Sequence, residues 1–209
     1  MSLHSYWLFV GASIVLALIP GPDMAYMLAR CIAQGRRAGL IAALGFNLGG
    51  YFHLAAAMLG LSAILATSSV AFTVVKWLGA AYLVYLGMGA LRSKQGPLVI
   101  NGSGLTSRGD RTILWQAFLS DALNPKVAMF FLALLPQFID PHASHPTLQI
   151  LVLGVTVNMI ALTSNILVVL CSARLTQKLR QNAAITNWMQ KAMGALFITL
   201  GLRLAAEKA

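Results

Sequence analysis

Six long apolar segments dominate this chain of 209 residues and limit what it can fold into. A helix needs roughly 20 mostly apolar residues to cross the hydrocarbon core of a bilayer. Because lipid-exposed backbone must satisfy its own hydrogen bonds, such segments predict an all-α polytopic membrane protein. The six expected transmembrane helices are Tyr6 to Leu28, Leu40 to Ala66, Phe72 to Leu91, Ile113 to Phe138, Leu148 to Cys171 and Trp188 to Ala205.

The charge content supports the lipid bilayer as the surrounding medium. Only 10% of the residues are charged and 58% are hydrophobic, whereas soluble globular domains carry about 25% charged residues. The formal net charge of +10 would fit a nucleic-acid partner if the basic residues formed one patch. They lie instead in short clusters between apolar segments, which predicts contact with an anionic membrane leaflet and no nucleic acid.

The distribution of Lys and Arg predicts how the helices are oriented. Cytoplasmic connections carry an excess of positive charge. Eleven basic residues follow the first, third and fifth helices: Arg30, Arg36, Arg37, Arg92, Lys94, Arg108, Arg111, Arg174, Lys178, Arg180 and Lys191. Only three, Lys76, Arg203 and Lys208, fall on the opposite side. Both chain termini are therefore predicted outside the cytoplasm.

The two halves of the chain share the order of their unusual residues. The first helix contains Pro20, Gly21 and Pro22, and the fourth contains Asn124 and Pro125 at the corresponding place. Weaker matches link helices two and five, and helices three and six. Because each half has three spans, an odd number, the second half enters the membrane in the opposite orientation. This pattern predicts an inverted repeat whose first and fourth helices are broken.

The repeat sets the expected domain organisation. Residues 1–92 form the first three-helix repeat and residues 113–209 the second. Residues 93–112 are rich in Gly and Ser, which predicts a flexible cytoplasmic linker. We expect the two repeats to build one transport domain.

The prolines at the two breaks indicate a binding site near the middle of the membrane. Pro22 and Pro125 cannot donate to the carbonyls of Leu18 and Asp121, which leaves backbone acceptors free for a cation or an ammonium group. The half-helix that follows each break offers free amides and a positive dipole to a carboxylate. A zwitterion matches both features. The alternative is that the prolines only kink continuous helices.

Three ionisable residues lie deep within the predicted spans: Asp23, Asp121 and Lys126. A charge at the bilayer centre costs about 2.5 to 3.5 kcal/mol on insertion scales, so function is the default explanation. We expect Asp23 or Asp121 to bind a substrate ammonium or a coupling proton, and Lys126 to attract a carboxylate. Structural alternatives are a helix cap at Asp23 and simple pairing of Lys126 with an aspartate.

Amides and glycines of helices two and five add candidates. Asn47, Asn158 and Asn165 are placed where they could line the pathway or hydrogen-bond between helices. Gly45 and Gly49 indicate close helix packing, which says little about function. His53 fits a structural role better than a proton relay. The full set of expected substrate or coupling residues is Asp23, Asp121, Lys126, Asn124, Gly21, Pro20, Pro22, Pro125, Asn47 and Asn158.

Several motifs resemble the LysE/RhtB family of amino-acid exporters. They are the Pro20 to Asp23 segment, the Gln34 to Gly39 loop, the Lys76 to Leu83 segment, Asn124 to Lys126 and Leu135 to Phe138. The resemblance implies efflux of amino acids or close derivatives across a bacterial inner membrane, driven by proton antiport. It implies no cofactor and no enzyme activity, and it is compatible with a homodimer. Asp121 is a departure, since the family often has Asn at that position.

Two other functions can be formulated from the residues. A transmembrane thiol redox relay would use Cys31 and Cys171, although both are predicted at the cytoplasmic ends of their helices. Export of toxic cations would require a cluster of Cys, His or carboxylate ligands, and no segment has metal-ligand spacing. We therefore expect no metal site.

Overall fold

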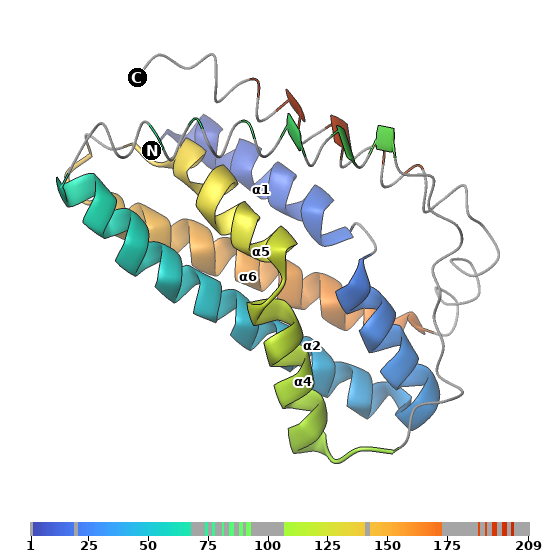
Figure 1. Ribbon diagram of the computed structural model, residues 1–209. Coiled ribbons are helices and arrows are strands. Elements are labelled where there is room, and N and C mark those ends of the chain that lie inside the picture. The colour runs from blue at the N-terminus through green and yellow to red at the C-terminus, as the bar shows by residue number, and fades with distance from the viewer. Residues whose placement is uncertain are drawn as a thin grey trace.

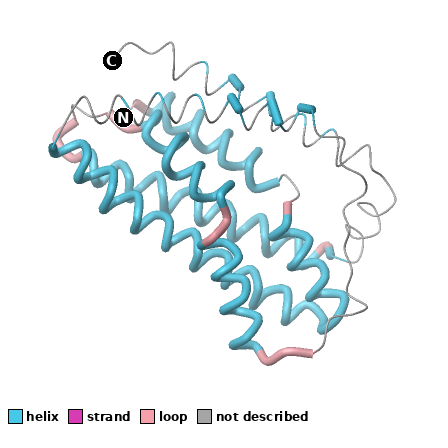
Figure 2. Tube along the Cα trace, viewed as in Figure 1, coloured by secondary structure: helices cyan, strands magenta, loops and turns pink. Residues whose placement is uncertain are grey.

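The computed structural model describes residues 2–18, 21–67, 107–140 and 143–172, with scattered residues from 74 to 92 and from 188 to 202. All regular structure in these ranges is helical, as Figures 1 and 2 show. The elements are α1 Leu3–Leu18, α2 Pro22–Thr67, α4 Asp110–Ala122, α5 Pro125–Met129, the π-helix η1 Phe130–Leu134, the 3-10 helix η2 Leu135–Phe138 and α6 Pro146–Leu170. The all-α prediction is confirmed for the described chain.

Within the described chain, two helices are long and apolar enough to cross a membrane: Asp23–Gly60 within α2, and Pro146–Leu170. The helices Asp110–Ala122 and Lys126–Phe138 make a third span if the pair, bent by 55°, is taken as one. α1 is shorter, at 16 residues. The predicted helices at 72–91 and 188–205 lie largely outside the described residues, as does most of the linker.

The connection between the first two predicted helices differs from expectation. We expected a loop from Ala29 to Gly39, but α2 is helical on both sides of Gly35, which alone has non-helical torsions, φ 81° and ψ 177°. α2 thus has two arms, residues 22–34 and 36–67, joined at one glycine (Figure 1). The start of the fourth predicted helix was also misplaced, because α4 begins at Asp110. The residues at these helix ends are polar, so the apolar pattern did not indicate that the helices extend through them.

Gly35→Ala should destabilise the protein, because the φ of +81° lies in a region that other L-residues adopt at a cost of about 1–3 kcal/mol. The measurement is thermal unfolding of purified protein in detergent. Gly109→Ala is the matched control, since Gly109 has an ordinary φ of −65° and open space where a Cβ would be. Equal melting temperatures for the two variants would refute the strain at Gly35.

The helices pack around two separate apolar clusters. The first joins α1, the end of α2, η1, η2 and α6, and includes Phe9, Leu54, Phe130, Phe138 and Leu153. The second joins both arms of α2, α4 and the end of α6, through residues such as Met27, Ala42, Ile113 and Val169. In Figure 1 α6 runs beside α1 and α2, and α4 crosses α2. The space between the clusters is where the helix breaks lie.

Glycines bring α2 unusually close to its neighbours. A Cβ on Gly45 would lie 2.5 Å from the carbonyl oxygen of Leu114, and one on Gly49 would lie 2.5 Å from the Cβ of Asp121. A Cβ on Gly50 would clash with the amide oxygen of Asn158 on α6. The predicted close packing is therefore present, and two of the three glycines face candidate site residues.

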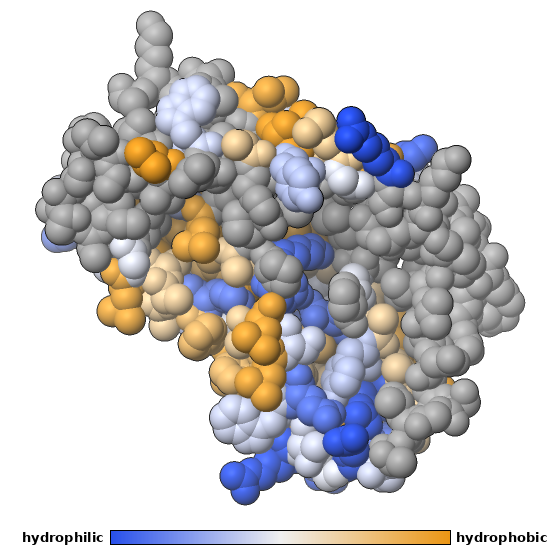
Figure 3. All heavy atoms as spheres, in the orientation of Figure 1, coloured by the Kyte–Doolittle hydropathy of each residue, from blue (hydrophilic) through white to orange (hydrophobic). Residues whose placement is uncertain are grey.

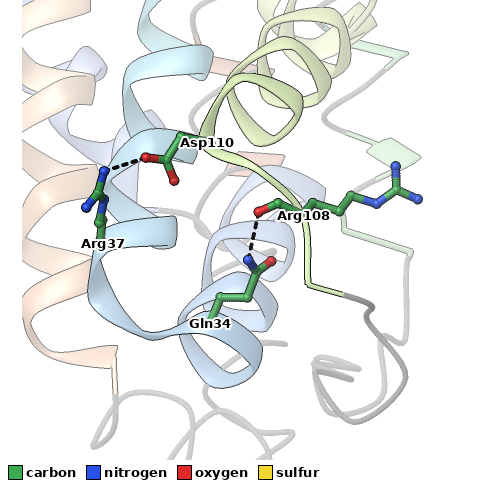
Figure 4. Close-up of polar contacts among 4 residues, drawn as sticks. All are labelled: Gln34, Arg37, Arg108 and Asp110. Atoms are coloured by element: carbon green, nitrogen blue, oxygen red, sulfur yellow. Dashed lines mark hydrogen bonds and ion pairs between the residues drawn. The ribbon is translucent and has the colours of Figure 1, made fainter.

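Polar contacts tie the start of α4 to the turn of α2, as Figure 4 shows. The Arg37 guanidinium is 2.6 Å from the Asp110 carboxylate, and the Gln34 amide donates to the Arg108 carbonyl at 2.9 Å. In Figure 3 hydrophilic residues gather over this end of the molecule, while hydrophobic residues cover much of the remaining described surface on that face. This polar end matches the predicted position of the first and third connections.

Candidate functional site

The two helix breaks face each other across the interior. Gly21 precedes α2 and accepts the first helical hydrogen bond from the amide of Ala25 at 3.0 Å. A Cβ placed on Gly21 would lie 3.9 Å from the Lys126 ammonium, which comes from the other break. Pro22 and Pro125 are the first residues of α2 and α5, where a missing amide hydrogen costs nothing. Both prolines start a helix, and at Pro125 the two helices on either side of the break are bent by 55°, which is a break and not a simple kink; Pro20 lies outside the described residues.

Asn124 links the breaks through both ends of its side-chain amide. Its oxygen caps α5 by accepting from the Lys126 backbone amide at 3.0 Å. Its nitrogen donates to Asp23 Oδ2 at 2.8 Å. One residue therefore defines the start of α5 and holds a carboxylate that belongs to α2.

Replacing Asn124 separates these two tasks. Asn124→Ala should lower stability by about 0.5–2 kcal/mol through loss of the cap, and it should also release Asp23. Asn124→Ser keeps a capping oxygen, so it should retain most of the stability while losing the longer reach to Asp23. Thermal unfolding of the purified variants measures the first effect and transport measures the second. An alanine variant as stable as the serine variant would contradict the cap.

Asp23 lies in the first turn of α2 with a half-satisfied carboxylate. Oδ2 accepts from Asn124, whereas Oδ1 is buried and has no hydrogen-bond partner among the residues that the structure describes. The start of a helix favours a negative charge, and a buried carboxylate oxygen without a donor is costly. The unpartnered oxygen is thus available to a cationic ligand. Asp23 is part of the first turn of α2 itself, so the alternative that it caps this helix does not apply.

Asp121 lies in the last turn of α4 and is 6% exposed. Its side chain packs on Gly49. Its carbonyl accepts from the Asn124 amide and contacts His53 Nε2, both at 2.9 Å. We expected this carbonyl to be free for a ligand because Pro125 cannot reach it; the structure shows that it is already paired. His53 therefore helps to hold the chain at the break between α4 and α5.

Lys126 is the cation of the site. Its ammonium interacts electrostatically with both Asp23 and Asp121. No ion pair within 4.0 Å joins Lys126 to a described carboxylate, so Lys126 is near Asp23 and Asp121 without contact pairing. An ammonium held in this way can accept a carboxylate ligand.

The two expected asparagines of α2 and α6 contact each other. The Asn47 side-chain amide donates to the Asn158 carbonyl at 3.0 Å. Asn158 is 4% exposed, and its own Nδ2 is buried without a hydrogen-bond partner in the described part of the chain. This nitrogen is an unused donor, as Asp23 Oδ1 is an unused acceptor.

These groups surround one cavity of about 120 Å³. Apolar walls from α1, α2, η1 and α6 complete it. The lining residues are Ser13, Leu16, Ala17, Gly21, Asp23, Met24, Phe46, Asn47, Gly50, Asp121, Lys126, Val127, Phe130, Phe131, Val157, Asn158, Ala161 and Asn165. The cavity volume is somewhat smaller than the roughly 150 Å³ of a cavity that binds benzene, so the space is on the scale of one small molecule.

Six of the ten expected residues line this cavity: Gly21, Asp23, Asn47, Asp121, Lys126 and Asn158. Asn124 positions Asp23 and Lys126 without lining it. The sequence reasoning missed Ser13, which lines the cavity, is fully buried and has a hydroxyl that no described residue hydrogen-bonds. A serine flanked by apolar residues in the second half of α1 was the available signal.

A polar network closes the cavity toward the end where α4 begins. The Tyr26 ring meets the cavity-lining Phe46 edge-on at 5.9 Å between centroids. The Tyr26 hydroxyl donates to Gln116 Oε1 at 3.1 Å, and Gln116 Oε1 also accepts from the Arg30 guanidinium at 3.2 Å. Arg30 is 2% exposed and also donates to Gln34 at 3.0 Å. Several contacts would have to break for the cavity to open at this end.

The two alternative chemistries find little support in the structure. The Cys31 Sγ and the side chain of Val169, which is two residues from Cys171, both lie next to Gly39, so the two free thiols lie at the same end of the bundle and do not span it. No group of three or more His, Cys, Asp or Glu residues suited to a metal occurs within the described ranges.

The broken apolar helices and the buried charged cavity between them are features of membrane transporters with discontinuous helices. A family model described as LysE type translocator matches residues 14–208. The chain therefore belongs to the LysE-type translocator family. It is a membrane transport protein and not an enzyme.

Individual relatives extend over the whole chain. An uncharacterized membrane protein of Vibrio cholerae is 33% identical over 209 residues, which is 100% of both chains. An uncharacterized membrane protein of Pseudomonas aeruginosa is 30% identical, covering 98% of this chain and 96% of the relative. A leucine efflux protein of Salmonella typhimurium is 27% identical, covering 96% of this chain and 94% of the relative. No solved structure matches the chain.

Proposed function

We propose that the protein exports amino acids or close derivatives from the cytoplasm of a bacterium, in exchange for protons. The observation that carries the proposal is the pair of unused buried groups in one cavity, the acceptor Asp23 Oδ1 and the donor Asn158 Nδ2. An α-amino acid supplies the complementary donor and acceptor. The similarity to a leucine efflux protein supports this substrate class.

In the proposed complex the substrate ammonium faces the carboxylates, and its carboxylate faces Lys126 and Asn158. Charge-assisted hydrogen bonds of this kind contribute about 1.5–3 kcal/mol each. The apolar walls, with Phe46, Phe130 and Val157 among them, would contact the side chain. The cavity volume of about 120 Å³ limits the cargo to one small molecule.

The proposed architecture around this site is six transmembrane helices in two inverted repeats, residues 1–92 and 113–209, with a cytoplasmic linker at 93–112. The two described breaks, each followed by a helix that starts with proline, support the repeat. The polar end formed by Arg37, Arg108 and Asp110 would face the cytoplasm, and both termini would lie outside it. The membrane would be the bacterial inner membrane. The proposed architecture is compatible with a homodimer.

The proposal is tested by exchange in proteoliposomes. Vesicles containing purified protein are loaded with each of the twenty common amino acids in turn, and uptake of the same labelled amino acid is followed. We expect at least one to exchange faster than in protein-free vesicles, and an imposed pH gradient to drive its accumulation. Failure of all twenty to exchange would overturn amino-acid export, whereas exchange that ignores the pH gradient would overturn only proton coupling.

A further inference from the structure

We infer that Asp121 carries the coupling proton and that Asp23 holds the substrate ammonium. This division of tasks rests on the proposed function and sharpens it, because either carboxylate could serve each purpose by residue type alone. The inference starts from the charge balance of the cavity and from the different surroundings of the two carboxylates.

Among the residues that the structure describes, the cavity lining holds two carboxylates and one ammonium group. Asp23 comes from α2, Asp121 from α4, and Lys126 from α5. Within the described ranges, the other titratable group facing Asp121 is His53 of α2, which contacts its carbonyl; α6 has no titratable side chain, and those of α1 are His4 and Tyr6 at its start. An uncompensated buried charge costs several kcal/mol. One additional positive charge, a proton or an ammonium group, therefore stabilises the pair of carboxylates.

The helix ends distinguish the two carboxylates. Asp23 lies in the first turn of its helix, where the dipole favours the anion, and one oxygen already accepts a hydrogen bond from Asn124. Asp121 lies in the last turn of α4, where the dipole disfavours an anion, and no hydrogen bond to its carboxylate occurs among the described contacts. The proton thus belongs on Asp121, while Asp23 stays charged for the substrate.

The proton on Asp121 and the substrate ammonium on Asp23 then compete to supply the same positive charge. When the ammonium enters beside Asp23, it supplies the positive charge that the proton on Asp121 had supplied, and Asp121 releases that proton. Binding linkage is reciprocal, so the proton weakens substrate binding by the same factor as the substrate weakens proton binding, typically 5-fold to 150-fold. This competition is what exchange of an amino acid for a proton requires.

The position of Asp121 also connects the proton to the helix break. Its side chain is seated on Gly49, and its carbonyl is held by the Asn124 amide and by His53. Asn124 in turn holds Asp23 at 2.8 Å. A change of charge on Asp121 therefore acts at the bend between α4 and α5 and, through one residue, on the substrate carboxylate.

The test measures proton release during binding, using the amino acid that exchanges fastest in the panel of twenty. Isothermal titration in buffers of different ionisation enthalpy should show about 0.4 to 0.9 proton released per substrate near the midpoint of the pH dependence, where the Kd should rise about 2-fold to 7-fold per pH unit on acidification. Substrate binding to the Asp121→Asn variant should release no proton. Its Kd should not depend on pH and should be about 5-fold to 150-fold higher than that of the wild type at alkaline pH. A pH gradient should not drive its exchange.

Asp23→Asn is the matched variant, and it should lose binding itself. Wild-type binding without proton release overturns the inference while leaving amino-acid export intact, and this result needs no variant to fold. An Asp121→Asn protein that keeps the wild-type pH dependence also overturns it. A wild-type protein that binds none of the twenty amino acids overturns the proposed function and this inference together.

Discussion

Lys126→Met should reduce amino-acid export about 10-fold to 150-fold. The Lys126 ammonium is the positive group that lines the cavity beside two carboxylates. The variant loses a charge-assisted hydrogen bond to the substrate, about 1.5–3 kcal/mol, and 1.4 kcal/mol corresponds to a factor of ten. It also leaves the carboxylates without compensation. Export is measured as efflux of labelled amino acid from preloaded cells at matched expression.

Arg37→Met provides the control for this loss. It also removes a cation from an ion pair, but the Arg37 side chain is 83% exposed and its partner Asp110 52%. Pairs of this kind contribute about 0.2–1 kcal/mol, so export should change less than about fivefold. Equal effects of the two substitutions would mean that the loss of export reflects a lower net charge of the protein and not the loss of a cation from the cavity.

Gly45→Ala should cost about 1–3 kcal/mol or more of stability, because the added methyl overpacks the contact between α2 and α4. The new Cβ would lie 2.5 Å from the Leu114 carbonyl oxygen and 2.6 Å from the Ala117 Cβ. Backbone cannot rotate away as a side chain can, so α4 must move. That shift would also displace Asp121, which packs on Gly49 one turn further along α2.

Gly11→Ala is the opposite case on α1. No atom lies within 4 Å of a Cβ placed on Gly11, and replacing a helical glycine with alanine contributes about 0.5–1 kcal/mol of stability. Thermal unfolding in detergent should therefore move down for Gly45→Ala and up for Gly11→Ala. A Gly45→Ala protein that melts at or above the wild-type temperature would contradict the tight α2–α4 contact.

Much of the helix content and the charged core of the site could be predicted from the sequence, because both depend on local features. Hydropathy marks the apolar helices, and proline marks the starts of α2 and α5. A charged residue in an apolar segment is visible without tertiary information, which is why Asp23, Asp121 and Lys126 were found.

The remaining features depend on contacts between distant residues. His53 and the carbonyl of Asp121 are 68 positions apart, and no local pattern specifies that pairing. The loss of a free carbonyl at Asp121 follows from it. The fully buried hydroxyl of Ser13 is likewise defined by what surrounds α1. The one-residue turn at Gly35 was missed because the neighbouring Arg36 and Arg37 suggested a loop.

The central claim is that the amino acid occupies the cavity between the two helix breaks, and substrate protection of a cavity thiol tests it most directly. The Ala161→Cys substitution places a thiol in the cavity lining, and Ser144→Cys places one on an exposed connection. In both variants Cys31 and Cys171 are replaced by alanine. The reaction rate with a methanethiosulfonate reagent is measured with and without the exchanged amino acid. We predict slower labelling at position 161 only. Unchanged labelling at 161 under saturating substrate would contradict the site.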